Sequence, residues 1–289
     1  MDNNEKQRRR VICVTGPTAT GKTSLAVRLA RRFNGEIISV DSRQVYVGMD
    51  IGTGKDLAEY GETPYHLIDV AIPGREVYNL QRFCLDAYRA IDDITSRGKL
   101  PILCGGTALY LEALLLGYDL PGDALPAREN GIPREQQTGT LPSITVPFGL
   151  DALTLGVYFE RKTVRSRIEQ RLDARLSEGM VDEVEALHRS GVTYEQLEFF
   201  GLEYREIARY LQGKCSHQEM RDQLLDRIRQ FAKRQDIFFR KMERENIIIH
   251  WLRSGSFPEA EKLVSAFLSG ETLPDVQFKL IDIVNGPSY

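Results

Sequence analysis

Short, continuous apolar runs alternate with amphipathic stretches along the first part of the chain. Four runs stand out: 11–15 (VICVT), 36–41 (EIISVD), 66–70 (HLIDV) and 99–104 (KLPILC). Leu25, Leu29 and Phe33 follow the first run at helical spacing, and a helical stretch at 81–98 separates the last two. Continuous apolar runs are typical of strands that are buried on both faces. The alternation therefore predicts a parallel sheet with helices on both faces.

The periodicity is lost after Leu120 and returns near residue 153. Residues 121–149 are rich in Pro, Gly and polar residues, which indicates a loop or insertion. Strands are predicted again at 153–159 (LTLGVYF) and 247–251 (IIIHW). Two long helices are predicted between them from two apolar rows: Val164, Ile168, Leu172 and Leu176, then Leu224, Ile228, Phe231 and Phe238.

We accordingly divide the chain into a core with one interruption. The predicted parts are an α/β core at 11–118, a shortened insertion at 119–152, a helical segment with strands that complete the core at 153–255, and tails at 1–10 and 270–289.

Composition adds few constraints. The 289 residues are 42% apolar and 27% charged, as in an ordinary globular protein, and no apolar stretch has the length of a membrane span. The four cysteines and four histidines are scattered without metal-ligand spacing. We expect a soluble cytoplasmic monomer with no membrane partner. The net charge of −3 means that a polyanion site would have to be a local patch.

The segment GPTATGKT has the form G-x-x-x-x-G-K-[ST] and lies between a predicted strand and a predicted helix. Its N–H groups and the helix dipole favour a bound phosphate chain. Lys22 supplies a positive charge, and the Thr23 hydroxyl is placed for Mg²⁺. Most such loops bind ATP or GTP, so the motif alone leaves the ligand open. The candidate binding residues are Gly16, Pro17, Thr18, Ala19, Thr20, Gly21, Lys22 and Thr23.

Two further motifs follow strands of the predicted sheet. Asp41 ends the second strand in DSRQVY, and GGTALY (105–110), with Thr107, follows the fourth. Carboxyl ends of parallel strands face the ligand crevice. A carboxylate there can ligate a metal or accept a proton, although a turn-capping Asp remains an alternative.

Basic rows accompany the two late helices. Residues 161–175 carry six basic and two acidic side chains, and residues 221–244 carry eight and four. The rows contain Arg167, Arg171 and Arg175 in the first helix, and Arg227, Gln230 and Arg234 in the second. They are a candidate polyanion patch, with solvated helix faces as the alternative.

Five segments in order resemble the tRNA dimethylallyltransferases, also called isopentenyltransferases. They are GPTATGKT, VDSRQVYVGMDIGTGK, LPILCGGTALYLEALL, RIEQRL with GMVDEVEAL, and FAKRQDIFFR. The resemblance covers most of 11–118 and 156–251. It implies a P-loop NTPase-like parallel sheet flanked by helices, with a reduced insertion and a helical C-terminal part.

The resemblance also implies an activity. The loop would bind dimethylallyl diphosphate with Mg²⁺, and the prenyl group would move to the exocyclic amine of the adenosine next to the tRNA anticodon. Asp41 would accept the amine proton, while Thr107 and Arg171 stabilise the departing diphosphate. The residues expected to contact adenine or tRNA are Asp41, Ser42, Arg43, Gln44, Thr107, Arg227, Gln230, Lys233, Arg234 and Gln235.

Three alternatives stay open at this point. Family members that act on tRNA usually have a much longer insertion, and related enzymes that prenylate free AMP, ADP or ATP also have a reduced one. A kinase that uses ATP is the second alternative, but nothing in kinases requires DSRQVY and GGTALY together. The third is a non-catalytic RNA-binding protein that lost its activity with the insertion, but the presence of Lys22, Thr23, Asp41, Thr107 and Arg171 speaks against it.

Overall fold

The computed structural model describes residues 8–76, 78–120, 128–129, 132–133, 143 and 145–285. A six-stranded parallel sheet has the strand order β3-β2-β4-β1-β7-β8. Its strands are β1 (Arg9–Thr15), β2 (Gly35–Ser39), β3 (Tyr65–His66), β4 (Leu100–Cys104), β7 (Leu150–Tyr158) and β8 (Ile249–Arg253). A separate antiparallel pair consists of β5 (Arg128–Glu129) and β6 (Ile132–Pro133). The predicted fold class is confirmed.

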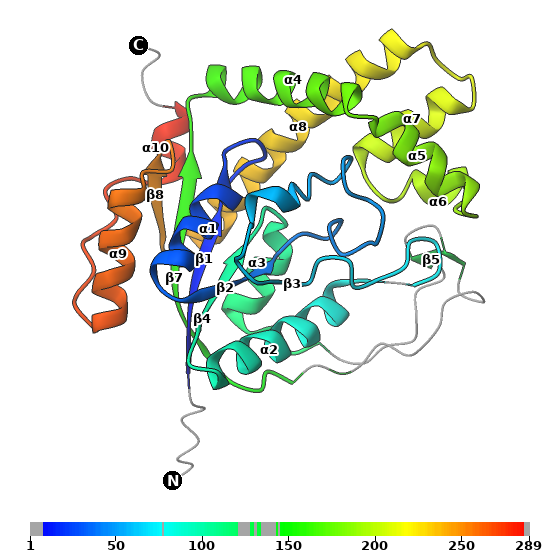
Figure 1. Ribbon diagram of the computed structural model, residues 1–289. Helices are drawn as coiled ribbons and strands as arrows, with labels where there is room; N and C mark the ends of the chain where they lie inside the picture. The colour runs from blue at the N-terminus through cyan, green and yellow to red at the C-terminus, as the bar shows by residue number, and fades with distance from the viewer. Residues whose placement is uncertain are drawn as a thin grey trace.

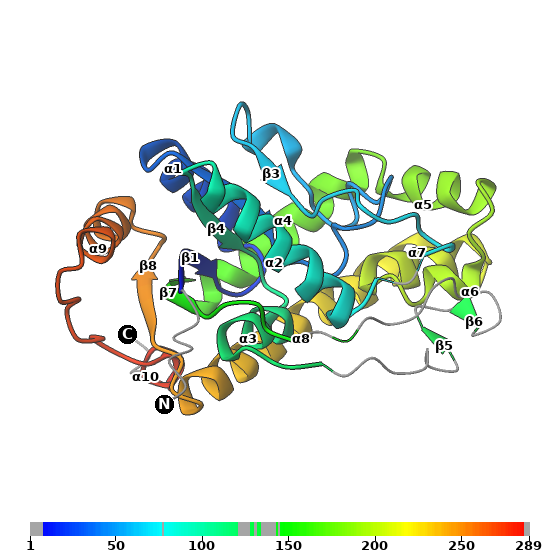
Figure 2. The same cartoon turned by 90° about the horizontal axis from the view of Figure 1, so that it is seen from below.

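Helices cover both faces of the sheet, as Figures 1 and 2 show. Helices α1 and α9 pack on one face, and α2, α3 and α8 pack on the other. The helices are α1 (Lys22–Arg32), α2 (Leu80–Ser96), α3 (Ala108–Leu116), α4 (Arg161–Ser177), α5 (Met180–Arg189), α6 (Tyr194–Leu197), α7 (Leu202–Leu211), α8 (His217–Arg244), α9 (Phe257–Ser269) and α10 (Leu280–Asn285), with a 3₁₀ turn η1 (Leu57–Glu59).

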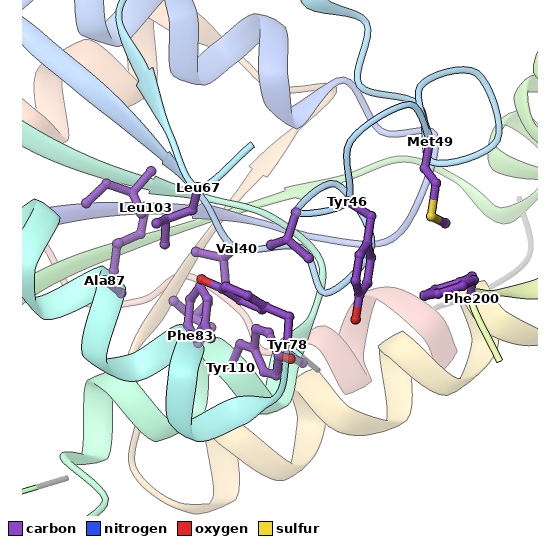
Figure 3. Packing of buried hydrophobic residues seen from close by; sticks show 14 of the residues in the cluster. Val40, Tyr46, Met49, Leu67, Tyr78, Phe83, Ala87, Leu103, Tyr110 and Phe200 are labelled. Carbon is purple, nitrogen blue, oxygen red and sulfur yellow. The ribbon is translucent and has the colours of Figure 1, made fainter. Parts of the chain in front are cut away.

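Successive residues of the central strand enter opposite cores. Val11 and Cys13 belong to the core beneath α2, α3 and α8, whereas Ile12 and Val14 belong to the core beneath α1 and α9. This follows from the two-residue period of a strand and explains why the strand sequence is apolar without interruption. In the first core, Phe83 of α2 stacks on Tyr110 of α3 with ring centroids 4.3 Å apart (Figure 3).

The third strand is shorter than predicted. The sequence predicts a strand at 66–70, but the paired residues are Tyr65–His66. Leu67 and Asp69 have φ values of 62° and 56°, in the left-handed region, so the chain cannot remain extended there. The predicted insertion at 119–152 lies mostly outside the described residues, as do 1–7 and 286–289 of the tails.

Helices α4 to α7 and the start of α8 lie beyond the carboxyl ends of the central strands, at the top and right of Figure 1. Helix α8 begins with a capping box between Ser216 and Glu219 and continues for 28 residues. Its length carries it from this helical group to the sheet, where it packs against α3. Among the described residues, no helix combines the length and apolar character needed to cross a bilayer.

Candidate active site

A cavity of about 500 Å³ lies beyond the carboxyl ends of β1, β2 and β4. Most of the predicted site residues line it: Thr18, Lys22, Thr23, Asp41, Ser42, Arg43, Gln44, Thr107, Arg171, Arg234 and Gln235. The strand order explains why these residues meet. From β1 the chain builds one half of the sheet with β2, β3 and β4 and then returns past β1 to build the other half with β7 and β8. Ligands bind at the carboxyl ends of the strands where the order reverses in this way. Eight predicted residues are not part of the cavity wall: five of the loop, Gly16, Pro17, Ala19, Thr20 and Gly21, and three of α8, Arg227, Gln230 and Lys233.

The phosphate-binding loop has a tightly determined backbone. Gly16 has φ 143°, and a Cβ atom there would come within 2.4 Å of the Val157 carbonyl oxygen, so only glycine fits. The Thr20 hydroxyl and the Lys22 ammonium group each donate to the Pro17 carbonyl at 2.8 Å. Burial lowers the pKa of Lys22 to about 8, with a contribution from the positive charge of Arg171. Among the residues that the structure describes, no carboxylate lies within ion-pair distance of the Lys22 ammonium group.

Asp41 both caps a turn and lines the cavity. Its Oδ1 accepts hydrogen bonds from the backbone N–H of Arg43 at 2.8 Å and of Gln44 at 3.4 Å. Burial raises the pKa of Asp41, and these two N–H groups oppose that shift. The turn-capping interpretation and the proton-acceptor interpretation are thus compatible, because one carboxylate can serve both purposes.

The GGT turn after β4 approaches the end of β2 closely. A Cβ atom at Gly105 would lie 2.1 Å from the Val40 carbonyl oxygen. The Thr107 hydroxyl accepts a hydrogen bond from the Ser42 backbone N–H at 3.1 Å. The two motifs that were predicted from separate strand ends are therefore joined directly, next to Asp41.

Gln235 connects helix α8 to two of these turns. Its side-chain oxygen accepts from the Thr18 N–H, and its side-chain nitrogen donates to the Gly106 carbonyl, both at 2.9 Å. The residue is only 7% exposed. In the structure its amide therefore lies between the phosphate-binding loop and the GGT turn, and the contact with adenine or tRNA that the resemblance implies for Gln235 stays a prediction.

The remaining predicted residues of α8 lie in different environments. Arg227 lies 2.7 Å from Glu206, whose carboxylate is fully buried. Gln230 and Lys233 are exposed on the helix surface. Arg234 lines the cavity and lies 6.0 Å from the ring of the exposed Phe231.

A loop that the sequence interpretation did not assign forms another wall. Glu183 of α5 accepts hydrogen bonds from the backbone N–H groups of Asp50, Ile51 and Gly52 at 2.8, 2.6 and 3.0 Å. It also accepts from the Tyr204 hydroxyl at 2.7 Å. These bonds fix the segment that brings Gly52, Thr53 and Gly54 to the cavity.

Lys55 also stabilises this loop, through a buried ammonium group. Its side chain is 1% exposed, and its ammonium group donates to the Tyr46 carbonyl at 2.7 Å and contacts Asp50 at 2.6 Å. Asp69 provides a further ion pair. Because Asp69 carries a left-handed backbone, the turn that shortens β3 also supplies this partner.

Several other wall residues were not among the predicted site residues. Arg175 of α4 belonged to the predicted basic row without a role of its own. The others are Tyr60 and residues that lead from α6 into α7, namely Phe199, Phe200, Gly201, Leu202, Glu203, Tyr204 and Arg205. Burial raises the pKa of Glu203, while Arg175 and Arg171 lower it. Apart from the basic row that contains Arg175, their sequence gave no signal that they line the cavity.

The site suits a metal that arrives with its ligand. The described residues contain no group of three or more His, Cys, Asp or Glu arranged to hold a metal ion. The Thr23 hydroxyl and the Asp41 carboxylate line the same cavity. Mg²⁺ commonly takes one or two protein oxygens and completes its shell with phosphate and water. The residues present therefore fit Mg²⁺ bound together with a diphosphate.

A central parallel strand, a glycine-rich anion-binding loop and a following helix define a P-loop protein of the α/β class. The IPP transferase family model matches residues 44–144 and 127–242, and the isopentenyl transferase model matches 9–63. The chain therefore belongs to the IPP transferase family, a family of prenyltransferase enzymes.

Named relatives extend this result. The chain is 45% identical over 292 residues to tRNA dimethylallyltransferase 1 of Geotalea uraniireducens, covering 88% of this chain and 96% of that protein. It is 44% identical over 281 residues to tRNA dimethylallyltransferase 2 of Shewanella sediminis, covering 84% and 93%. A crystal structure of a tRNA isopentenylpyrophosphate transferase from Bacillus halodurans matches with a TM-score of 0.74 and 29% identity, over 91% of this chain and 96% of that one.

Proposed function

We propose that the protein transfers a dimethylallyl group from dimethylallyl diphosphate to the exocyclic amine of the adenosine next to a tRNA anticodon. One observation carries the proposal: the anion-binding loop after β1 and the Asp41 carboxylate after β2 line a single cavity, at the carboxyl ends of parallel strands that only β4 separates. A group-transfer reaction of this kind needs an anion site for the leaving group and a base for the nucleophile in the same space.

Asp41 is the proposed base. As the amine nitrogen forms its bond to C1 of the prenyl group, the C1–O bond breaks and its electron pair leaves with the diphosphate. The nitrogen then loses one proton, which the Asp41 carboxylate accepts. The raised pKa of Asp41 brings its basicity closer to that needed at neutral pH.

The leaving diphosphate would lie on the loop. Lys22, the loop N–H groups and Arg171 supply positive charge, and Thr107 holds the Ser42 backbone beside Asp41. Mg²⁺ held by Thr23 and diphosphate oxygens would neutralise further charge. Together these groups stabilise the charge that develops on the leaving oxygen.

The acceptor side is more open. Arg43 and Arg234 are basic residues of the cavity wall, and Gln230 and Lys233 are exposed on α8. We propose that the latter two contact the RNA backbone and that the adenine enters beside Ser42. Gln44 shapes the wall, because its amide donates to the Gly54 carbonyl at 3.0 Å and accepts from the Ser39 hydroxyl at 2.8 Å. A base in a single-stranded loop can enter such a cavity at low cost.

The names of the relatives bear on the free-nucleotide alternative. The relatives that match 88% and 84% of this chain are both named tRNA dimethylallyltransferases, which supports tRNA rather than a free nucleotide as the acceptor. We propose that a monomer is sufficient for activity, because the loop residue Lys22 meets Asp41, Thr107 and Arg171 in one cavity.

One assay tests the acceptor. Purified protein receives dimethylallyl diphosphate with an anticodon stem-loop, AMP or ATP, and the products are resolved by mass. We expect a gain of one dimethylallyl group on the stem-loop, and none on a matched stem-loop with guanosine at the target position. Transfer to AMP with none to RNA would instead establish the free-nucleotide activity.

A further inference from the structure

Two arginines of α4 converge at the wall of the cavity. Arg171 and Arg175 are one helical turn apart and therefore share a face. A Cβ atom at Gly54 would lie 2.3 Å from Nη2 of Arg171 and 1.7 Å from Nη2 of Arg175. Gly54 thus leaves room for both guanidinium groups to reach the same place, and any side chain there would displace them.

The charges at this place are not balanced. Both arginines face one carboxylate oxygen of Asp56, at 3.0 Å from Arg171 and 3.7 Å from Arg175. The Arg175 side chain is 12% exposed, and its buried Nη2 has no hydrogen-bond partner among the described residues. Burial lowers the pKa of Arg175 to about 10, and the neighbouring Arg171 adds to this effect. A buried guanidinium nitrogen without an acceptor is a costly arrangement that an anion would relieve.

The position relative to the phosphate-binding loop indicates which anion. Besides the main cavity, both arginines line a smaller cavity of about 30 Å³ together with Thr18 and Ala19 of the loop. Glu203 lies on the same wall, but no ion pair within 4 Å joins it to either arginine in the part of the chain that the structure describes. The Arg175 guanidinium group, whose Nη2 has no acceptor among the described residues, therefore lies next to the phosphate-binding loop.

We propose that Arg175 binds the donor diphosphate together with Arg171, and that Asp56 is the carboxylate that both exchange for it. The inference rests on the proposed function and adds a residue to its donor site. Two guanidinium groups match the several oxygens of a diphosphate better than the single exposed carboxylate. Asp56 is 49% exposed, so it can move into solvent when the diphosphate arrives.

A purely structural pairing is the alternative, and the two interpretations predict opposite signs. If Asp56 competes with the donor, then Asp56→Asn should strengthen diphosphate binding, whereas Arg175→Met should weaken it. If the pairs only hold α4 in place, both variants should weaken binding and lower Tm. Asp56 has φ 37°, and Asn tolerates this left-handed backbone, so Asp56→Asn removes the charge without disturbing the turn.

Isothermal titration with inorganic pyrophosphate and Mg²⁺ measures both effects on the full chain. We expect Kd to rise about tenfold in Arg175→Met, since a hydrogen bond to a charged group is lost, and to fall about threefold in Asp56→Asn. Arg165→Gln is the matched control, because Arg165 is exposed on the same helix outside the cavity. Its Kd should stay within about twofold of wild type.

The outcomes separate the two proposals. Failure of the wild-type protein to bind pyrophosphate would overturn the proposed donor site itself. Wild-type affinity in Arg175→Met, or weaker binding in Asp56→Asn, would overturn the exchange while the donor site remains. If Arg175→Met does not fold, the sign of the change in Asp56→Asn still decides the question.

Discussion

The proposed donor end of the cavity and helix α8, which we propose to contact the acceptor, differ in how directly the sequence determines their arrangement. At the donor end, Thr18, Lys22 and Thr23 come from one continuous motif, and all three reach the cavity. On α8, the candidate residues lie in one continuous segment, yet they separate. Arg234 and Gln235 line the cavity, Arg227 pairs with buried Glu206, and Gln230 and Lys233 are exposed.

The difference comes from backbone geometry. A loop that curls around an anion directs neighbouring residues to one point, because consecutive N–H groups point inward. A helix turns by about 100° per residue, so residues that are neighbours in sequence face different surroundings. A functional segment on a helix therefore contains structural and binding residues side by side.

The largest expected effect tests the donor end. Asp41→Asn should lower kcat by about 10³, since general-base catalysis contributes about 10²–10⁴, while pyrophosphate affinity stays close to wild type. The Asn oxygen can still accept the bonds from Arg43 and Gln44, so the turn should persist. Single-turnover rates and pyrophosphate titration measure the two quantities.

The pH profile provides the control. Activity of the wild type requires the ionised carboxylate, so it should fall as pH decreases through the pKa of Asp41, which burial raises above its ordinary value. Any residual activity of Asp41→Asn should lack this acidic limb. Full turnover in this variant would remove Asp41 from its proposed role.

A smaller effect tests the division within α8. Arg227→Ala should lower the free energy of unfolding by about 2 kcal/mol, because, among the described residues, it leaves Arg209 at 3.6 Å as the one cation paired with the fully buried Glu206. Lys233→Ala, on the exposed surface, should change it by less than about 0.5 kcal/mol. Urea denaturation measures both.

RNA binding completes this comparison. Lys233→Ala should weaken stem-loop binding and reduce its dependence on salt, as expected for a lost phosphate contact. If Arg227→Ala kept wild-type stability and lost RNA affinity, Arg227 would return to the RNA-binding set predicted from the sequence.

The smallest effect concerns Lys22. Burial lowers its pKa to about 8, so the free protein loses this positive charge as pH rises through 8. Pyrophosphate affinity of the wild type should fall by about tenfold between pH 7 and 9.5 relative to Lys22→Arg, whose guanidinium stays charged. The paired titration cancels the ionisation of pyrophosphate itself. Parallel curves for the two proteins would contradict the lowered pKa.

The strands, the loop and the strand-end residues could be predicted because their patterns are local and the carboxyl ends of parallel strands share one edge. The cavity wall formed by residues 50–54 could not be predicted. Its position depends on hydrogen bonds to Glu183, and the sequence around Glu183 does not indicate which backbone N–H groups this carboxylate contacts. Arg171 and Arg175 looked alike in one basic row, and only packing places Gly54 beneath them. The short third strand depends on left-handed residues that an apolar run conceals.

Gln235 has a consequence for which residue types this position can tolerate. Its side chain must accept at one end and donate at the other, towards Thr18 and Gly106. Glutamate has the same shape but would set a second acceptor against a carbonyl, asparagine is one methylene shorter, and leucine offers neither group. The requirement is for a direction of polarity rather than for size or charge. Gln235→Glu should therefore disrupt the contact between the two turns as much as truncation of the side chain would, although Gln and Glu differ by a single terminal group.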